Sequence, residues 1–281
     1  NYHRENIIGE QLVGAGFSEI MNNSLTKSSY YEETGYNAYP WEETVKVMNP
    51  LSADLGVMRQ TLLFGGLESI VRNVNRKAQN LRFFEVGNVY KYNKERWAEE
   101  NPVKAYSQDY HMALWVTGKR VQGSWAHPDE ESSFYELKAH VENILRRIGV
   151  AQGLLVSEKS DNNVFDKAIA LKTRAGKVLV EMGILSHKLL KRFGLDQKVY
   201  YADLDWAGLM KAIRKNKLQF QEISKYPAVS RDLALLVDNN VEFAQIEEIA
   251  RQADKKLLKR VELFDVYQGK NLPEGKKSYA V

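Results

Sequence analysis

Two stretches near the end of the sequence decide how its last part folds: KYPAVSRDLALLVD at 225–238 and LFDVYQGKNLPEGKKSYAV at 263–281. Pro227 favours an extended chain on entry, and the apolar run from Leu233 to Val237 then predicts a strand. Between the two stretches, apolar residues at helical spacing predict one amphipathic helix with a buried face formed by Phe243, Ile246, Ile249 and Ala250. The order strand, helix, strand, turn, strand is that of the first half of a ferredoxin-like unit.

Composition limits the class of protein. The 281 residues suffice for one large domain and a small one. No apolar run reaches the ~20 residues of a membrane span, and the lack of cysteine excludes disulfides and thiolate metal sites. The net charge of +4 is too small for a dedicated nucleic-acid binder, so RNA contacts are expected to be local. We expect a cytoplasmic protein without a membrane segment.

Upstream of residue 215 the pattern is an α+β arrangement of antiparallel strands broken up by helices. Strands are expected at 17–25, 45–52, 81–90, 111–117, 154–156, 168–173, 178–185 and 199–204. Helices are expected at 1–16, 67–77, 134–148, 187–193 and 206–215, and a surface loop at 32–41. The polar stretch from Lys215 to Ser224 indicates a boundary, which gives a domain at 1–215, a linker at 216–224 and a domain at 225–281.

Five upstream segments, in their order along the chain, are MNPLSADLGVMRQTLL (48–63), RNVNR (72–76), FFEVGNVY (83–90), FYELK (134–138) and EMGILSHKLLKRF (181–193). Together they resemble the catalytic-like module of bacterial-type phenylalanyl-tRNA synthetase beta subunits. Residues 225–281 resemble the anticodon-binding domain of the same subunit. The resemblance implies a class II aminoacyl-tRNA synthetase-like antiparallel sheet with flanking helices, followed by a partial ferredoxin-like domain.

The resemblance also implies a function. In that family the beta subunit pairs with an alpha subunit that carries the active site, in an alpha2-beta2 heterotetramer. The complete enzyme uses ATP and Mg, with ATP on the alpha subunit, to attach phenylalanine to tRNA(Phe). This chain would then bind no cofactor, hold tRNA in place for the ligase, and be inactive alone.

No catalytic residue is expected in this chain. A class II active site holds ATP phosphates with arginines, because a guanidinium binds phosphate oxygens bidentately. The Gly-x-Gly-x-x-Arg ending that carries one of them is missing, and the corresponding segment at 200–208, YYADLDWAG, contains acids instead. The five histidines show no ligand spacing, so no metal site is expected.

Three arginines, Arg59, Arg72 and Arg76, are candidates for a subunit interface. Arg59 has two other interpretations: it braces a loop, which is favoured together with the interface role because the partner arginine is missing, or it is a catalytic arginine. Glu85 lies in the middle of a predicted strand and is interpreted as a structural glutamate with a partner. The alternative for Glu85 is the remnant of a substrate-side carboxylate.

Basic and aromatic residues of the last domain are candidates for tRNA contacts, because cations hold phosphates and exposed rings stack on bases. They are Tyr226, Arg231, Lys255, Lys256, Lys259, Arg260, Tyr267 and Lys270. The alternative for the basic cluster is a solvated helix end stabilised by the helix dipole.

A complete ferredoxin-like unit needs a second helix and a fourth strand, and this sequence stops in the third strand, at Val281. For a chain that truly ends there, we expect weakened or absent anticodon binding. Two rival functions stay open: a scaffold protein that does not bind RNA, and an independent enzyme that uses a pocket of the first domain. Binding of tRNA in the presence of the alpha subunit tests the first rival, and binding of ATP by the isolated chain tests the second.

Overall fold

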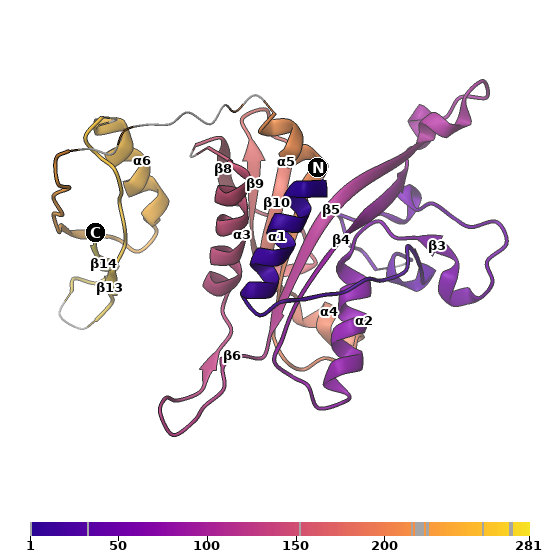
Figure 1. Cartoon of the computed structure of the whole chain (residues 1–281), viewed down its shortest axis with the longest axis horizontal. Coiled ribbons are helices and arrows are strands. Elements are labelled where there is room, and N and C mark those ends of the chain that lie inside the picture. Colours follow the sequence, from indigo (N-terminus) through magenta and orange to yellow (C-terminus); the bar gives the residue numbers. More distant parts are fainter. Residues whose placement is uncertain are drawn as a thin grey trace. The chain divides into compact units, whose positions relative to one another are not determined.

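The computed structural model describes residues 2–32, 34–151, 153–214, 216, 222, 225–254, 256–269 and 272–281. The chain divides into two compact units, Asn1–Leu218 and Gln219–Val281, and Figure 1 shows the elements of both. Most of the linker predicted at 216–224, and the helix end predicted at Lys215, lie outside the described residues.

A mixed sheet forms the centre of the first unit. Within the described residues it has seven strands, in the order β1-β4-β5-β11-β10-β9-β8. They are β1 (Ser18–Glu19), β4 (Leu81–Tyr92), β5 (Tyr106–Thr117), β8 (Leu155–Lys159), β9 (Phe165–Thr173), β10 (Val178–Leu185) and β11 (Val199–Asp205). The α+β class is confirmed, but the expectation of an antiparallel sheet is wrong at one edge. There β1 and β4 are parallel, because the chain between them crosses over through a helix instead of turning in a hairpin.

Helices cover both faces of this sheet (Figure 1). One buried core joins the sheet to α1 (Tyr2–Gly14), α3 (Phe134–Ile148) and α5 (Trp206–Ala212), and the other joins it to α2 (Leu63–Val74) and α4 (His187–Arg192). The helix predicted at 134–148 is confirmed as α3. The Ser133 side chain caps it by accepting a hydrogen bond from the Glu136 amide, and Gly149 ends it at a φ of 88°.

Short elements occupy the connections of the first unit. They are β2 (Leu25–Thr26), β3 (Val57–Met58), β6 (Lys119–Val121), β7 (Glu130–Glu131) and the 3-10 helices η1 (Ser28–Tyr30), η2 (Trp41–Glu43), η3 (Ala53–Leu55), η4 (Lys94–Arg96) and η5 (Pro102–Ala105). β2 pairs with β3, and β6 pairs with β7. Among the helices of the described residues, none has the length and apolar character needed to cross a membrane.

Three predictions for the region before α2 are wrong. The strand predicted at 17–25 is reduced to β1 and the start of β2, because Asn22 between them turns its side chain toward polar groups of β4 and α2. The strand predicted at 45–52 forms one bridge, from Lys46 to Val57. The surface loop predicted at 32–41 packs inward, since Tyr36 and Tyr39 are buried in the core around the Phe64 ring.

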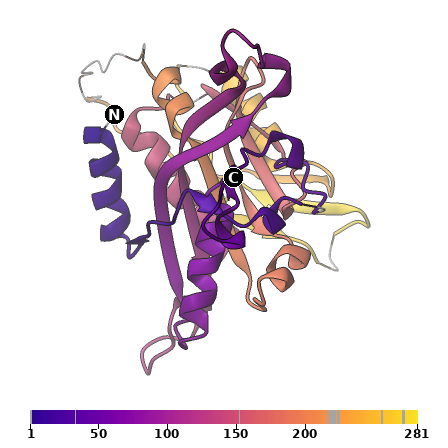
Figure 2. The same cartoon turned by 90° about the vertical axis from the view of Figure 1, so that its right-hand side faces the viewer.

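β4 and β5 form a long hairpin, whose strands Figure 2 shows along their length. Their register runs from Leu81 opposite Thr117 to Tyr92 opposite Tyr106. The strands predicted at 81–90 and 111–117 are confirmed, and both continue further toward the tip. The tip itself contains η4 and η5.

Within its described residues, the second unit contains β12 (Ala234–Asp238), α6 (Phe243–Ala253), β13 (Asp265–Tyr267) and β14 (Lys276–Ala280). Its strand order is β12-β14-β13, and both pairs are antiparallel, so the predicted order of elements is confirmed. The predicted buried face of α6 is wrong. No residue of this fully described helix is buried, and Ile249 is 67% exposed. Three short strands and one helix have too little apolar surface to enclose it.

Candidate functional site

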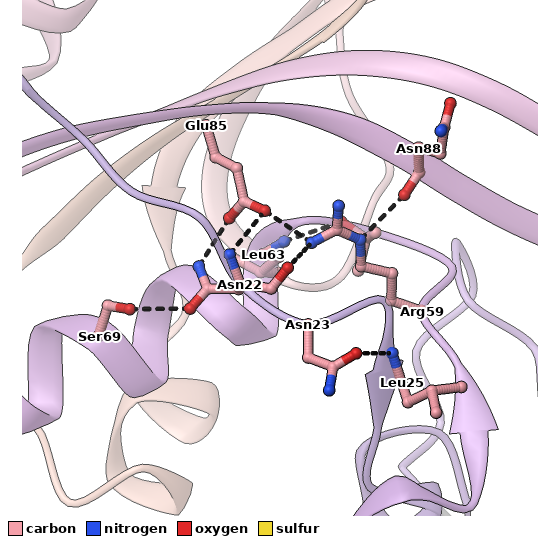
Figure 3. A network of polar contacts seen from close by, with 9 residues as sticks. Asn22, Asn23, Leu25, Arg59, Leu63, Ser69, Glu85 and Asn88 are labelled. Atoms are coloured by element: carbon pink, nitrogen blue, oxygen red, sulfur yellow. Dashed lines mark hydrogen bonds and ion pairs between the residues drawn. The ribbon is translucent and has the colours of Figure 1, made fainter.

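Arg59 and Glu85 form a buried ion pair that joins three segments of the first unit (Figure 3). Arg59 follows β3, Glu85 lies in the middle of β4, and Arg59 Nη1 is 2.6 Å from Glu85 Oε1. The Nε atom of Arg59 donates to the Asn88 carbonyl at 2.9 Å. Asn22 donates from its side-chain nitrogen to Glu85 at 2.6 Å and accepts a hydrogen bond from Ser69 of α2 at 3.0 Å. The network ties the Asn22 segment and α2 to the central sheet.

The two charges of this network are satisfied within the chain. A buried charge is tolerated when it is paired and hydrogen-bonded, and both conditions are met here. Glu85 is therefore a structural glutamate with a partner, and Arg59 braces its own loop and the Asn22 segment. Gly87 makes room for this arrangement, because a Cβ at that position would overlap Arg59 Nη2. A role of Arg59 in a subunit interface stays a prediction.

The sheet face that carries Glu85 continues across β5, β11 and β10 with acidic and aromatic side chains. His111 Nδ1 lies 3.0 Å from both carboxylate oxygens of Asp203. Glu181 accepts a hydrogen bond from the Asn162 side chain at 2.7 Å. Glu181 and Asp203 are directly opposite each other, and Tyr201, two residues from Asp203 on the same face, is fully buried. This polar arrangement was missed by sequence reasoning, because its members come from separate strands.

Burial sets the electrostatics of this face. Burial by itself lowers the pKa of His111, but the charge and hydrogen bonds of Asp203 outweigh it, and the pKa is raised. The pKa values of Tyr39 and Tyr201 are raised far above the ordinary value, first by burial and then by the charge of Asp203. The face therefore carries carboxylates and neutral phenols, and its cation Arg59 is already paired with Glu85.

The segment at 200–208 forms β11 and the start of α5. Asp205 caps α5 by accepting a hydrogen bond from the Gly208 amide at 2.7 Å, and it lies 2.6 Å from Lys177. The acids of this segment thus have structural partners. Among the described residues, no group of three or more His, Asp or Glu side chains could hold a metal ion.

Arg72 and Arg76 are exposed, on α2 and just after its end. Arg72 lines a hollow of about 810 Å³ together with Lys27 and Arg192. Lys27 and Arg192 were missed by sequence reasoning, because they lie far from Arg72 in the sequence. The structure does not gather the three predicted interface arginines into one cluster, since Arg59 is buried.

The sheet of the second unit has one covered face and one open face. On the covered face, Tyr279 is buried and its hydroxyl donates to the Val241 carbonyl at 3.1 Å. Side chains alternate between the faces, so Leu236, Ser278 and Tyr267 form one row across the other face. Tyr267 is 43% exposed and Leu236 is 54% exposed. An aromatic ring is therefore presented to solvent on a flat sheet surface.

Two further tRNA candidates lie before the first strand of this unit. Arg231 precedes β12 and is exposed, and Tyr226 is 85% exposed. Lys255 and Lys270 lie outside the described residues.

The other basic candidates, Lys256, Lys259 and Arg260, lie in the connection between α6 and β13. Arg260 is paired with Glu262, whereas Lys259 donates to the Lys256 carbonyl at 3.2 Å. Since α6 ends at Ala253, these three residues follow the helix, and both interpretations of the cluster stay predictions.

Comparison with protein families gives two matches. Residues 1–206 match the family described as the phenylalanyl tRNA synthetase beta chain CLM domain. Residues 224–281 match the ferredoxin-fold anticodon binding domain.

Curated relatives cover the whole chain. The phenylalanine–tRNA ligase beta subunit of Bacteroides thetaiotaomicron is 57% identical over 277 residues, which are 99% of this chain and 34% of the relative. The corresponding subunit of Porphyromonas gingivalis is 50% identical over 280 residues, which are 100% of this chain and 34% of the relative. This chain spans about a third of the length of these relatives.

Among solved structures, PylSc of Desulfitobacterium hafniense, a pyrrolysyl tRNA synthetase, has a similar fold. The two share 16% identity at a TM-score of 0.54, over 76% of this chain and 68% of that one. The match of the family model to residues 1–206 extends over more than half of the sequence. The chain therefore belongs to the family of the phenylalanyl tRNA synthetase beta chain CLM domain.

Proposed function

We propose that this chain is a region of a phenylalanine–tRNA ligase beta subunit. It pairs with a catalytic alpha subunit in a cytoplasmic alpha2-beta2 assembly and helps to position tRNA(Phe) for ATP-dependent aminoacylation. The two family matches support the two halves of this function, subunit pairing by the first unit and tRNA binding by the second.

The first unit is a class II synthetase-like domain without an active site of its own. Its fold is similar to that of a tRNA synthetase, which supports the class. Its central sheet face carries Asp203, Glu181 and neutral tyrosines, where an ATP site needs cations. ATP and Mg are accordingly bound by the alpha subunit, and this chain supplies no catalytic residue.

The proposed domain boundaries are 1–215, a linker at 216–224, and 225–281. The compact units Asn1–Leu218 and Gln219–Val281 support this division. The family matches, which end at 206 and begin again at 224, support it as well.

The observation that carries the RNA-binding half is the open sheet face of the second unit. Bases stack on exposed aromatic rings without a requirement for one sequence, and Tyr267 offers such a ring beside Leu236. Basic residues of the same unit hold the phosphates in this proposal. The other proposed tRNA-binding residues are Tyr226, Arg231, Lys255, Lys256, Lys259, Arg260 and Lys270.

On the first unit, Arg72 and Arg76 are the proposed contacts with the alpha subunit. Both are exposed on or beside α2, so a partner can reach them. Arg59 acts indirectly in this interface, because its network fixes α2 through Asn22 and Ser69.

A titration of the chain and alpha subunit with fluorescent tRNA(Phe) tests the RNA-binding half. Tyr267→Ala removes the stacking ring, which is worth about 1–3 kcal/mol per base, so binding weakens roughly 5- to 150-fold. The control is Tyr135→Ala, which removes an exposed tyrosine of α3. If the mixture does not bind tRNA, the rival function as a scaffold is supported. Binding of ATP by the isolated chain supports the rival function as an independent enzyme.

A further inference from the structure

Two hollows share one wall at the base of the β4–β5 hairpin tip. Tyr92 ends β4 and Tyr106 begins β5, and the two residues are directly opposite each other in the register. Their ring centroids are 5.3 Å apart. Both residues line a hollow of about 460 Å³ and a second one of about 360 Å³. The tyrosine pair thus separates two neighbouring cavities, each within the size range of small-ligand sites.

The larger hollow is aromatic. Besides the two tyrosines, it is lined by Trp41, Lys46 and the acid Glu42, and Lys46 Nζ lies 4.3 Å from the Trp41 ring centroid. Tyr106 is 51% exposed, so its ring is accessible to a ligand. Thr44 at the edge of the hollow is buried, and its hydroxyl lies 2.6 Å from Gln60 Nε2, which fixes this wall. Rings arranged in this way suit a flat, aromatic ligand.

The smaller hollow is cationic. It is lined by Lys91, Arg96 and Lys104. Lys91 is neutralised by Glu43 at 3.0 Å, whereas Arg96 and Lys104 have no ion-pair partner among the residues that the structure describes. Asp109 is the other acid in this wall. Two unpaired cations therefore lie beside the aromatic hollow, on the other side of the tyrosine pair.

The tip that carries these cations is itself ordered. The Asn93 side chain accepts a hydrogen bond from the Glu95 amide at 2.9 Å and caps η4. The Asn93 amide donates to the Ala105 carbonyl at 2.7 Å and closes the hairpin. The backbone that carries Arg96 and Lys104 is therefore held close to Tyr106 by hydrogen bonds of the loop.

We propose that the base of the β4–β5 hairpin binds an unpaired nucleotide segment of RNA. One base stacks on Tyr106 next to Trp41, and the adjoining phosphates lie on Arg96 and Lys104. The assignment rests on the proposed function for the choice of RNA as partner, but it concerns a site separate from the sheet of the second unit. The chemistry is sequence-tolerant, since each base has a flat face and the cations contact only the backbone.

The expected changes in affinity follow from the number of stacking rings and phosphate contacts in the proposed site. Loss of one stacking ring weakens single-strand binding roughly 5- to 150-fold. Two phosphate contacts give a salt slope of about −1.4, so a fourfold rise in salt weakens binding by about sevenfold.

The test uses the full chain and a fluorescein-labelled oligouridylate of about eight nucleotides, followed by anisotropy. Tyr106→Ala weakens binding roughly 5- to 150-fold, and Tyr106→Phe, which keeps the ring, does not. Tyr135→Ala is the control for loss of an exposed tyrosine elsewhere in the same unit. Replacing Arg96 and Lys104 together by serine lowers the affinity and flattens the salt dependence. Ultraviolet cross-linking places the uridine adduct in residues 91–106 or on Trp41.

The outcomes separate this site from the proposed function. If Tyr267→Ala weakens binding but Tyr106→Ala does not, the hairpin site is refuted and the tRNA role of the second unit stands. If Tyr106→Ala weakens binding and Tyr267→Ala does not, the hairpin site stands and the role of Tyr267 is refuted. An acidic peptide that competes as well as RNA would identify a general anion or peptide site, and this would also overturn the assignment.

Discussion

Replacement of Glu85 by glutamine removes a buried charge and keeps the shape of the side chain. The wild-type carboxylate accepts hydrogen bonds from Arg59 Nη1, from the Asn22 amide and from Asn22 Nδ2. A glutamine offers one oxygen, and its NH2 group must face a donor. The Arg59 guanidinium then stays buried without a counter-charge.

The expected loss follows from these contacts. Removing one partner of a buried ion pair costs about 3–5 kcal/mol, because the remaining charge is left unpaired in a medium of low polarity. The first unit falls in the size class in which 1 kcal/mol changes the melting temperature by about 2–4 °C. The predicted decrease is therefore about 6–20 °C. An Arg59→Met, Glu85→Gln double variant recovers part of it, since the unpaired charge is gone.

Tryptophan fluorescence during thermal unfolding measures this loss. The chain has five tryptophans and all of them lie at or before residue 206, so the signal reports on the first unit. The control is Glu130→Gln, which breaks a pair with Arg120 whose side chains are both half exposed. That variant loses less than about 1 kcal/mol. Equal effects of Glu85→Gln and Glu130→Gln would refute the view that the buried network fixes α2 to the sheet.

Three further outcomes are expected. Gly87→Ala displaces the Arg59 guanidinium and costs about 1–3 kcal/mol of unfolding free energy, measured by urea titration; an unchanged midpoint would count against the close contact. Because the folded pKa of His111 is raised, its contribution to stability is complete below about pH 6.5 and is lost as the pH rises through the folded pKa. His111→Gln should remove that part of the pH dependence of the unfolding free energy. The same pH dependence in the wild-type protein and the variant would refute this role of His111. Arg72→Glu combined with Arg76→Glu weakens binding to the alpha subunit about tenfold or more in a titration, whereas Lys211→Glu on α5 does not.

Elements with a strong local pattern could be predicted from the sequence. The apolar spacing of α3, bounded by a serine and a glycine, defines this helix with no knowledge of its neighbours. The apolar and aromatic run at 81–90 similarly predicts β4. The strand and helix order of the second unit follows from turn residues and periodicity, so it was also accessible.

Features that depend on contacts between distant segments could not be predicted. Tyr36 and Tyr39 lie in a segment that looks polar, and they are buried in a core that includes the Phe64 ring of α2. The Arg59–Glu85 pair joins the residue after β3 to the middle of β4, two segments that are separate in the sequence. The Tyr92–Tyr106 wall depends on the register of a long hairpin. In each case the energy comes from tertiary packing, which local propensity does not report.

The proposed function depends most on the pairing of the first unit with a catalytic alpha subunit. The most direct measurement mixes the purified chain with the alpha subunit of a close relative, such as that of Bacteroides thetaiotaomicron, and determines the molar mass by light scattering during size-exclusion chromatography. We expect a complex that contains both chains in equal numbers and that is weakened by the Arg72→Glu, Arg76→Glu variant. Separate elution of the two chains at concentrations of tens of micromolar (on the order of those at which specific interfaces of standard size associate) would contradict it.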